Sequence, residues 1–228
     1  MMPPRSLSIG FALISLLFPF IAAAGDQNDE PGISDGAMGY VVAVGTAPLL
    51  FNTDQFNDDV ETLGLSALSF PLAGKISMGG DLGNGPHYLR FTNTFTFSNQ
   101  VSHRRGDYAE LSILYLDLAF GWRYQFSRSI GLHADVGFAF GEWQYVLITD
   151  DFNGQATGRL FGVTPRSGFM FCLSQDMWLN FYGGYSAFFH ERGSLYSGDM
   201  QRENFDDFDF DHALVGVELM FLVCKHKR

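Results

Sequence analysis

The chain has 228 residues, of which 16% are aromatic and 26 are glycines, and its formal net charge is −11. This acidic balance argues against a nucleic-acid partner, which would require a basic face. The two cysteines, Cys172 and Cys224, are too few for a disulfide scaffold.

The first 24 residues have the three regions of a secretory signal peptide. Arg5 supplies a positive charge, residues 7–21 are apolar, and Ala22-Ala23-Ala24 offers small residues before Gly25. We therefore predict cleavage after these alanines, with an N-terminal membrane anchor as the alternative. Residues 25–37 are predicted to be a linker. Beyond the signal no run of about 18 uncharged apolar residues occurs, so no membrane helix is predicted.

Residues 38–224 are predicted to form strands, because apolar residues recur at every second position. The first two candidates, residues 39–49 and 61–79, alternate less regularly, and Pro48 and Pro71 indicate bulges or strand ends. The third candidate, residues 88–97, alternates cleanly. Its apolar face is formed by the following residues: Leu89, Phe91, Phe95 and Phe97.

Residues 114–140 combine apolar sequence with charges. Even positions from 114 to 124 and from 132 to 140 are apolar, whereas odd positions carry the charged and polar residues. On a helix the even set would scatter around the axis, but on a strand it forms one face. With the turn-like residues 126–129 between its halves, this segment predicts a β-hairpin with one apolar face and one polar face.

Residues 159–173, 178–189 and 212–221 repeat the pattern, which brings the predicted total to eight strands. The predicted connections alternate in length, as in bacterial outer-membrane barrels. The short ones are residues 81–85, 125–129 and 174–176, and the long polar ones are residues 52–59, 98–107, 149–158 and 190–209.

The polar face is rich in Gly, Ser, Thr and charges of both signs, which fits a narrow barrel interior. A soluble lipocalin-like barrel, with its apolar face inside, is the alternative. Aromatic residues near strand ends fit interfacial girdles: Trp122, Tyr124, Trp178 and Tyr145. Trp143 and Tyr145 have the parity of the polar face, which we interpret as a bulge at residues 141–142. We predict an all-β, eight-stranded antiparallel up-and-down transmembrane β-barrel.

Residues Gly216–Phe221 have the form Gly-x-x-hydrophobic-x-aromatic. In this respect the chain resembles the eight-stranded outer-membrane barrels typified by the outer-membrane-protein-A transmembrane domain, whose last strand is bound by the barrel assembly machinery. The resemblance implies a Gram-negative outer membrane, with loops outside and turns in the periplasm, but no single activity. Residues 225–228 are predicted to be a basic tail.

A Lys or Arg on the lipid face costs about 2–4 kcal/mol at mid-bilayer, so charged residues of the strands should face inward. An eight-stranded interior is only wide enough for side chains to fill it. We expect a polar network of paired residues there: Arg90, Asp117, Arg123, His133, Asp135, Arg166 and Glu218. A gated pore or proton path is the alternative. His133 and Asp135 lack a third metal ligand, so no metal site is predicted.

The predicted long loops contain three weaker candidates. His190, Ser194, Ser197 and Glu203 are similar to the serine–histidine–acid sites of lipid A deacylases, although Arg192 stands where that family would have a serine. Arg105-Gly106-Asp107 matches the integrin-recognition tripeptide, and an ordinary turn is the alternative.

The third candidate is an acidic cluster that could hold Ca²⁺ or bridge lipopolysaccharide phosphates through divalent cations: Asp206, Asp207, Asp209 and Asp211. Its spacing is not that of an EF-hand, and a solvated loop is the alternative. No cofactor is predicted. Cys172 and Cys224 are predicted to be free thiols, because they lie two strands apart.

Together these features predict an outer-membrane barrel with a structural or adhesin-like role through its long loops, without enzymatic activity. Its expected partners are outer-membrane lipids, lipopolysaccharide, the assembly machinery and an extracellular receptor. A narrow solute channel, a lipid-modifying enzyme and a soluble ligand-binding barrel are the alternative functions.

Overall fold

The computed structural model describes residues 38–50, 56–57, 60–61, 64–68, 72–84, 86–127, 129–150, 153–174, 176–190, 194–197, 200–202 and 210–226. The predicted signal peptide and linker lie outside the described residues. Within the described ranges, no helix is long and apolar enough to cross a membrane.

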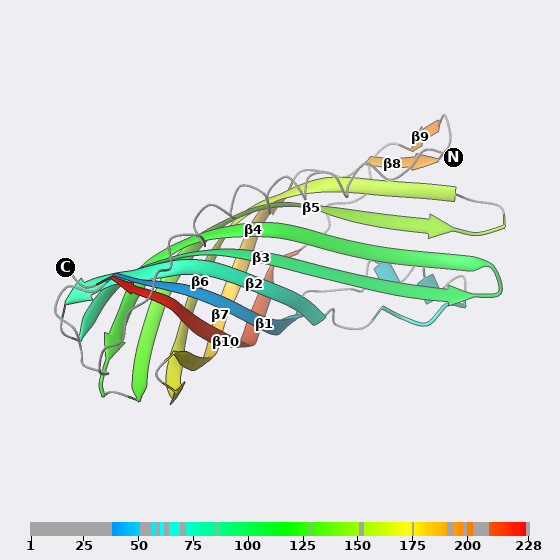
Figure 1. The fold of residues 1–228 in the computed structure, drawn as a ribbon. Helices are drawn as coiled ribbons and strands as arrows, with labels where there is room; N and C mark the ends of the chain where they lie inside the picture. Colours follow the sequence, from blue (N-terminus) through cyan, green and yellow to red (C-terminus); the bar gives the residue numbers. More distant parts are fainter. Residues whose placement is uncertain are drawn as a thin grey trace. The chain divides into compact units, whose positions relative to one another are not determined.

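The described strands are β1 (Met38–Leu50), β2 (Leu72–Asn84), β3 (His87–Arg104), β4 (Asp107–Gln125), β5 (Ile130–Ile148), β6 (Asn153–Ser174), β7 (Met177–His190), β8 (Ser194–Ser197), β9 (Met200–Arg202) and β10 (His212–His226). Strands β1 to β7 and β10 pair in sequence order, and the β1–β10 pairing closes the sheet (Figure 1). All of these pairings are antiparallel. The predicted eight-stranded up-and-down barrel is therefore confirmed. Strands β8 and β9 form a small hairpin that extends the sheet beside β6.

Burial alternates along the strands of the barrel. In β4, Asp117 is 2% exposed and faces inward, whereas Phe120, which points to the opposite face of the strand, is 67% exposed. The other strands repeat this arrangement, with apolar residues outside and polar residues inside. Since successive side chains of a strand point to opposite faces, the period of two in the sequence sets both surfaces.

Two predicted long loops are wrong. Strand β3 continues to Arg104 and β4 begins at Asp107, so residues 98–107 form paired strands and a tight turn. Arg105 and Gly106 have positive φ angles of 51° and 108°, as a two-residue hairpin turn that matches strand twist requires. Likewise, β5 ends at Ile148 and β6 begins at Asn153. These segments are mostly polar in sequence, which made them resemble loops, yet most of their residues keep strand pairing.

The predicted strand over residues 61–79 is also partly wrong, because β2 begins only at Leu72. In the connection before it, Phe56, Asn57, Val60 and Glu61 are helical. Apolar residues of this connection are buried in the barrel instead of facing outward along a strand. The predicted bulge at residues 141–142 is absent, since the β4–β5 pairing runs without a register shift over both described strands.

Glycines on the inner face make room for large polar side chains of neighbouring strands. A Cβ atom on Gly137 of β5 would overlap the Asp117 carboxylate and the Thr164 hydroxyl group. A Cβ atom on Gly216 of β10 would overlap the phenol ring and hydroxyl oxygen of Tyr182. These close approaches explain why bulky side chains fit into so narrow an interior.

We predict that Gly137→Ala lowers the free energy of unfolding by about 1–3 kcal/mol, because the new methyl group overlaps the Asp117 carboxylate. The matched control is Gly131→Ala on the same face of β5, where the nearest atom lies 3.4 Å away. Urea unfolding of the barrel refolded in detergent would measure both. Equal stability of the two variants would contradict this account.

Candidate functional site in the barrel interior

The polar interior is centred on Arg166 of β6. Its Nε donates to Asp135 Oδ1 at 2.8 Å, and its Nη1 lies 3.3 Å from Asp117 Oδ2. The other oxygen of Asp135 lies 2.9 Å from His133 Nδ1. All four side chains are buried. One guanidinium thus joins β6 to both β4 and β5 by ion pairs that are shielded from water.

Hydrogen bonds extend this centre across the lumen. His133 Nε2 lies 2.9 Å from Asn180 Oδ1 on β7, and Asn180 Nδ2 donates to Glu218 Oε2 on β10 at 3.2 Å. Ser77 of β2 approaches the other Glu218 oxygen at 3.4 Å. Thr164 Oγ1 donates to Asp117 at 2.7 Å. Side chains from β2, β4, β5, β6, β7 and β10 therefore form one polar network.

A second ion pair lies toward the end of the barrel that carries the short turns, called here the turn end. Arg123 Nη1 lies 2.5 Å from Asp81 Oδ2, and its guanidinium carbon lies 4.3 Å from the Tyr88 ring centroid. The Trp178 ring lies 5.9 Å away. Asp81 was predicted to lie in a short turn, but it belongs to β2. Asp81 lies four residues after Ser77 and therefore points to the same, inward face of β2. This spacing could have identified Asp81 as an interior residue.

Arg90 and Lys75 have no carboxylate in direct contact among the described ion pairs. Arg90 Nη1 lies 3.3 Å from the sulfur of Met170. The Lys75 ammonium lies 5.3 Å from the Tyr182 ring centroid. Lys75 was not predicted as an interior residue, because the alternation was weak where β2 begins.

The charges of the described interior balance when the histidines are neutral. Four basic residues, Lys75, Arg90, Arg123 and Arg166, accompany four acidic residues, Asp81, Asp117, Asp135 and Glu218. This pairing limits the uncompensated charge inside the barrel, since a buried charge without any partner would be strongly destabilising.

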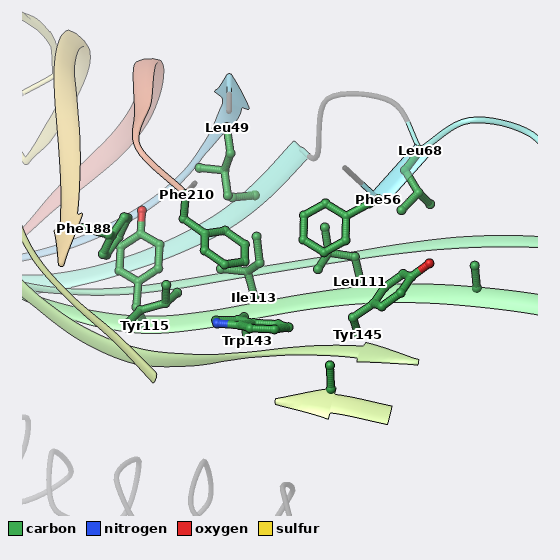
Figure 2. Close-up of a cluster of buried hydrophobic side chains, with 14 of the residues drawn as sticks. Leu49, Phe56, Leu68, Leu111, Ile113, Tyr115, Trp143, Tyr145, Phe188 and Phe210 are labelled. Atoms are coloured by element: carbon green, nitrogen blue, oxygen red, sulfur yellow. The ribbon is translucent and has the colours of Figure 1, made fainter. Parts of the chain in front are cut away.

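The opposite end, called here the loop end, has an apolar interior (Figure 2). Trp143 and Tyr145 face inward there and are not part of an outer girdle. The ring of Phe56 lies 5.3 Å from that of Tyr145, and the ring of Phe210 lies 5.4 Å from that of Trp143. We call this cluster the apolar plug; it comprises strand residues and residues of two connections: Leu49, Phe56, Val60, Leu65, Leu68, Leu111, Ile113, Tyr115, Trp143, Tyr145, Leu160, Phe188 and Phe210.

The connection between β1 and β2 is held in place at the plug by hydrogen bonds between side chains and its backbone. Asn57 Nδ2 donates to Leu68 O at 3.1 Å, and its Oδ1 accepts from Leu68 N at 2.7 Å. Arg104 Nη1 donates to Gly64 O at 2.6 Å. These contacts keep Phe56, Leu65 and Leu68 inserted.

Little space remains within the polar network of the described residues. A cavity of about 10 Å³ lies among residues of the polar network, including His133, Tyr182 and Glu218. This volume suits about one water molecule. The arrangement provides ion pairing and close packing, and no room for a substrate within the polar network.

The weaker candidates fall elsewhere. His190 ends β7, and Ser194 and Ser197 bound β8, while their side chains and Glu203 lie outside the described residues. The Asp211 carboxylate accepts from Phe188 N at 2.6 Å.

Asp206, Asp207 and Asp209 also lie outside the described residues. Within the described part of the chain, no group of three or more His, Cys, Asp or Glu residues could hold a metal ion. The thiol of Cys172 is free, and it contacts Ser174 O at 2.9 Å. The Cys224 side chain is outside the described set.

We predict that Arg166→Met lowers the free energy of unfolding by about 3–5 kcal/mol, because it leaves Asp117 and Asp135 buried without their cation. Arg159→Met is the matched control, since Arg159 lies on the exposed face of the same strand. Its effect should stay within about 0.5 kcal/mol. Comparable losses in both variants, measured by urea unfolding, would argue against a central role for Arg166.

No family model and no curated protein matches this chain. Among solved structures, it is similar to a major outer membrane protein from Thermus thermophilus, with a TM-score of 0.50 and 10% identity over 81% of this chain and 99% of the other. It is also similar to Ail, the attachment invasion locus protein of Yersinia pestis, with a TM-score of 0.48 and 8% identity over 82% and 99% of the chains. The expected resemblance to small outer-membrane barrels is confirmed at the level of the fold.

Proposed function

We propose that the chain is an integral outer-membrane barrel with a closed interior that displays a water-facing sheet at the cell surface. The observation that carries this proposal is the inverted burial of the barrel. Large apolar side chains such as Leu89, Phe120 and Phe169 are exposed on its outer face, while ion pairs fill its interior. A soluble ligand-binding barrel would have the opposite arrangement, and so large an exposed apolar surface marks contact with lipid or protein.

The apolar surface has the height of a bilayer core. On β4 the outward residues are apolar or aromatic from Tyr124 to Leu114 and then become polar at Ser112. Ten residue steps of about 3.4 Å, tilted by about 40°, give a band of roughly 26 Å, close to the ~25 Å apolar band of outer-membrane barrels. The apolar band ends at a similar height on the next two strands. Its boundary falls between Phe140 and Glu142 on β5 and between Phe161 and Arg159 on β6.

Aromatic rings mark the turn end of this band. The ring of His87 stacks on that of Trp122 at 5.6 Å, and Trp122 stacks on Tyr124 at 5.7 Å. Phe126 packs edge-on against Tyr124 at 4.8 Å. Amphipathic rings of this kind suit the interface between lipid and water, which supports placing the turn end at a membrane surface.

The display role rests on the length of β3 to β6. These strands have 18, 19, 19 and 22 residues, whereas a membrane crossing needs about 9–11. Figure 1 shows β3, β4 and β5 continuing beyond β1 and β2 at the loop end. The filled lumen supports this role over a solute channel, because the polar network and the apolar plug occupy it one after the other along the barrel axis. As the last strand, β10 would present residues 216–221 to the assembly machinery.

We predict that Phe138→Arg, on the outer face of β5 within the apolar band, lowers the free energy of unfolding by about 2–4 kcal/mol. Gln144→Arg lies on the same face above the band and should have little effect. Heat-modifiable gel mobility and urea unfolding in lipid vesicles would compare the two variants. If the mature chain remains in the soluble periplasm without a mobility shift, the membrane proposal is wrong.

The closed interior leads to a separate prediction for purified protein in planar bilayers. We expect no stable conductance steps, because the cavity described within the polar network has a volume of about 10 Å³ and holds about one water molecule. Regular steps that change upon Arg123→Gln would contradict this expectation and favour a narrow channel.

A further inference from the structure

His133 lies between two hydrogen-bond acceptors. Its Nδ1 is 2.9 Å from Asp135 Oδ2, and its Nε2 is 2.9 Å from Asn180 Oδ1. The other Asp135 oxygen accepts from Arg166, which favours the ionised carboxylate. A neutral imidazole has one donor and one acceptor nitrogen, so it cannot donate to both neighbours.

Rotating the Asn180 amide does not remove this conflict. In the described orientation, Asn180 Nδ2 donates to Glu218 Oε2 at 3.2 Å, and His133 must donate from both nitrogens. In the rotated orientation, Nδ2 would donate to His133, and the amide oxygen would then face the Glu218 carboxylate. That contact requires a proton on Glu218. Either orientation therefore needs one proton more than a neutral histidine with ionised carboxylates would supply.

We propose that the barrel interior contains a specific proton-binding site, in which a single proton is shared between His133 and Glu218 through the Asn180 amide. The proton satisfies contacts that join β5, β7 and β10. Without it, two acceptors would oppose each other at about 3 Å in a buried setting, which is unfavourable. The site goes beyond the proposed display function and does not depend on it.

The surrounding charges define the electrostatic setting of this proton. Asp135 lies on the same strand as His133, and Arg166 approaches from β6. Arg90 from β3 and Glu218 from β10 line the same small cavity as His133. The remaining charged groups of the interior lie on β2 and β4: Lys75, Asp81, Asp117 and Arg123, the last being the cross-strand neighbour of His133 and paired with Asp81.

The ring of His133 is closely surrounded by the barrel wall. A Cβ atom on Gly168 of β6 would lie 2.7 Å from His133 Nε2, so glycine at this position leaves room for the imidazole. His133 is 2% exposed. The imidazole is therefore closely packed and shielded from bulk water in this position.

The Glu218→Gln variant tests the proposal sharply. A glutamine amide can donate to the rotated Asn180 oxygen, so all contacts are satisfied with a neutral His133 and without the extra proton. The variant also has the same net charge as the protonated wild-type network, because one lost carboxylate replaces one bound proton. Asp81→Asn is the matched control, since Asp81 is a buried carboxylate outside this chain of contacts.

The measurement is nuclear magnetic resonance at pH 7.5 on the full barrel in detergent, with ¹⁵N-labelled histidine and ¹³C-labelled glutamate. Spectra of His133→Gln and Glu218→Gln assign the signals, and heat-modifiable mobility verifies folding. In wild type we expect either a doubly protonated His133 or a protonated Glu218. In Glu218→Gln we expect a neutral His133 protonated on Nδ1, while Asp81→Asn should match wild type.

A neutral His133 together with an ionised Glu218 in folded wild type would overturn the proposal. A doubly protonated His133 that persists in folded Glu218→Gln would overturn it as well. If that variant fails to fold, the wild-type spectra alone decide the matter. Membrane fractionation tests the proposed function separately, since a soluble barrel with this interior would give the same spectra.

Discussion

The closure of eight antiparallel strands into one ring constrains the rest of this molecule. The ring leaves an interior that only side chains can fill, and the inward residues must pack against one another within that space. Arg166 shows how this is achieved, because its guanidinium contacts carboxylates from β4 and β5 at once. Removing water from these charges is costly, and the cost is offset only because each carboxylate also accepts other hydrogen bonds.

The same constraint explains the glycines of the inner face. Asp117 and Tyr182 extend over glycines of neighbouring strands, where any Cβ atom would overlap them. Polar packing and glycine placement are therefore one feature of the barrel. A substitution at Gly137 or Gly216 would act through the side chain that lies over it.

The interior changes chemistry along its axis. Ion pairs fill the turn end and centre, whereas aromatic and aliphatic side chains fill the loop end (Figure 2). Connections supply part of this filling, with Phe56 and Phe210 packed against Tyr145 and Trp143. The loop end thus resembles the core of a soluble domain, and in the proposed membrane placement the sheet that surrounds it continues into water. This arrangement is why we assign display to the strands and sealing to the connections.

The amino-acid sequence by itself determined the strand period and the two faces of β3 to β7 and β10, because alternation is a local property. The expected number of strands followed from counting the alternating segments, whereas closure depends on the pairing of β1 with β10. It could not reveal the inward position of Trp143 and Tyr145 as an apolar core, since their packing partners Phe56 and Phe210 are far away in the chain. Polar residues near the loop end also made β3 to β6 seem shorter in the sequence than they are in the structure. Only the tertiary structure decided which charges meet, as with Asp81 and Arg123, because contacts across a lumen depend on strand register and tilt, which no single strand contains.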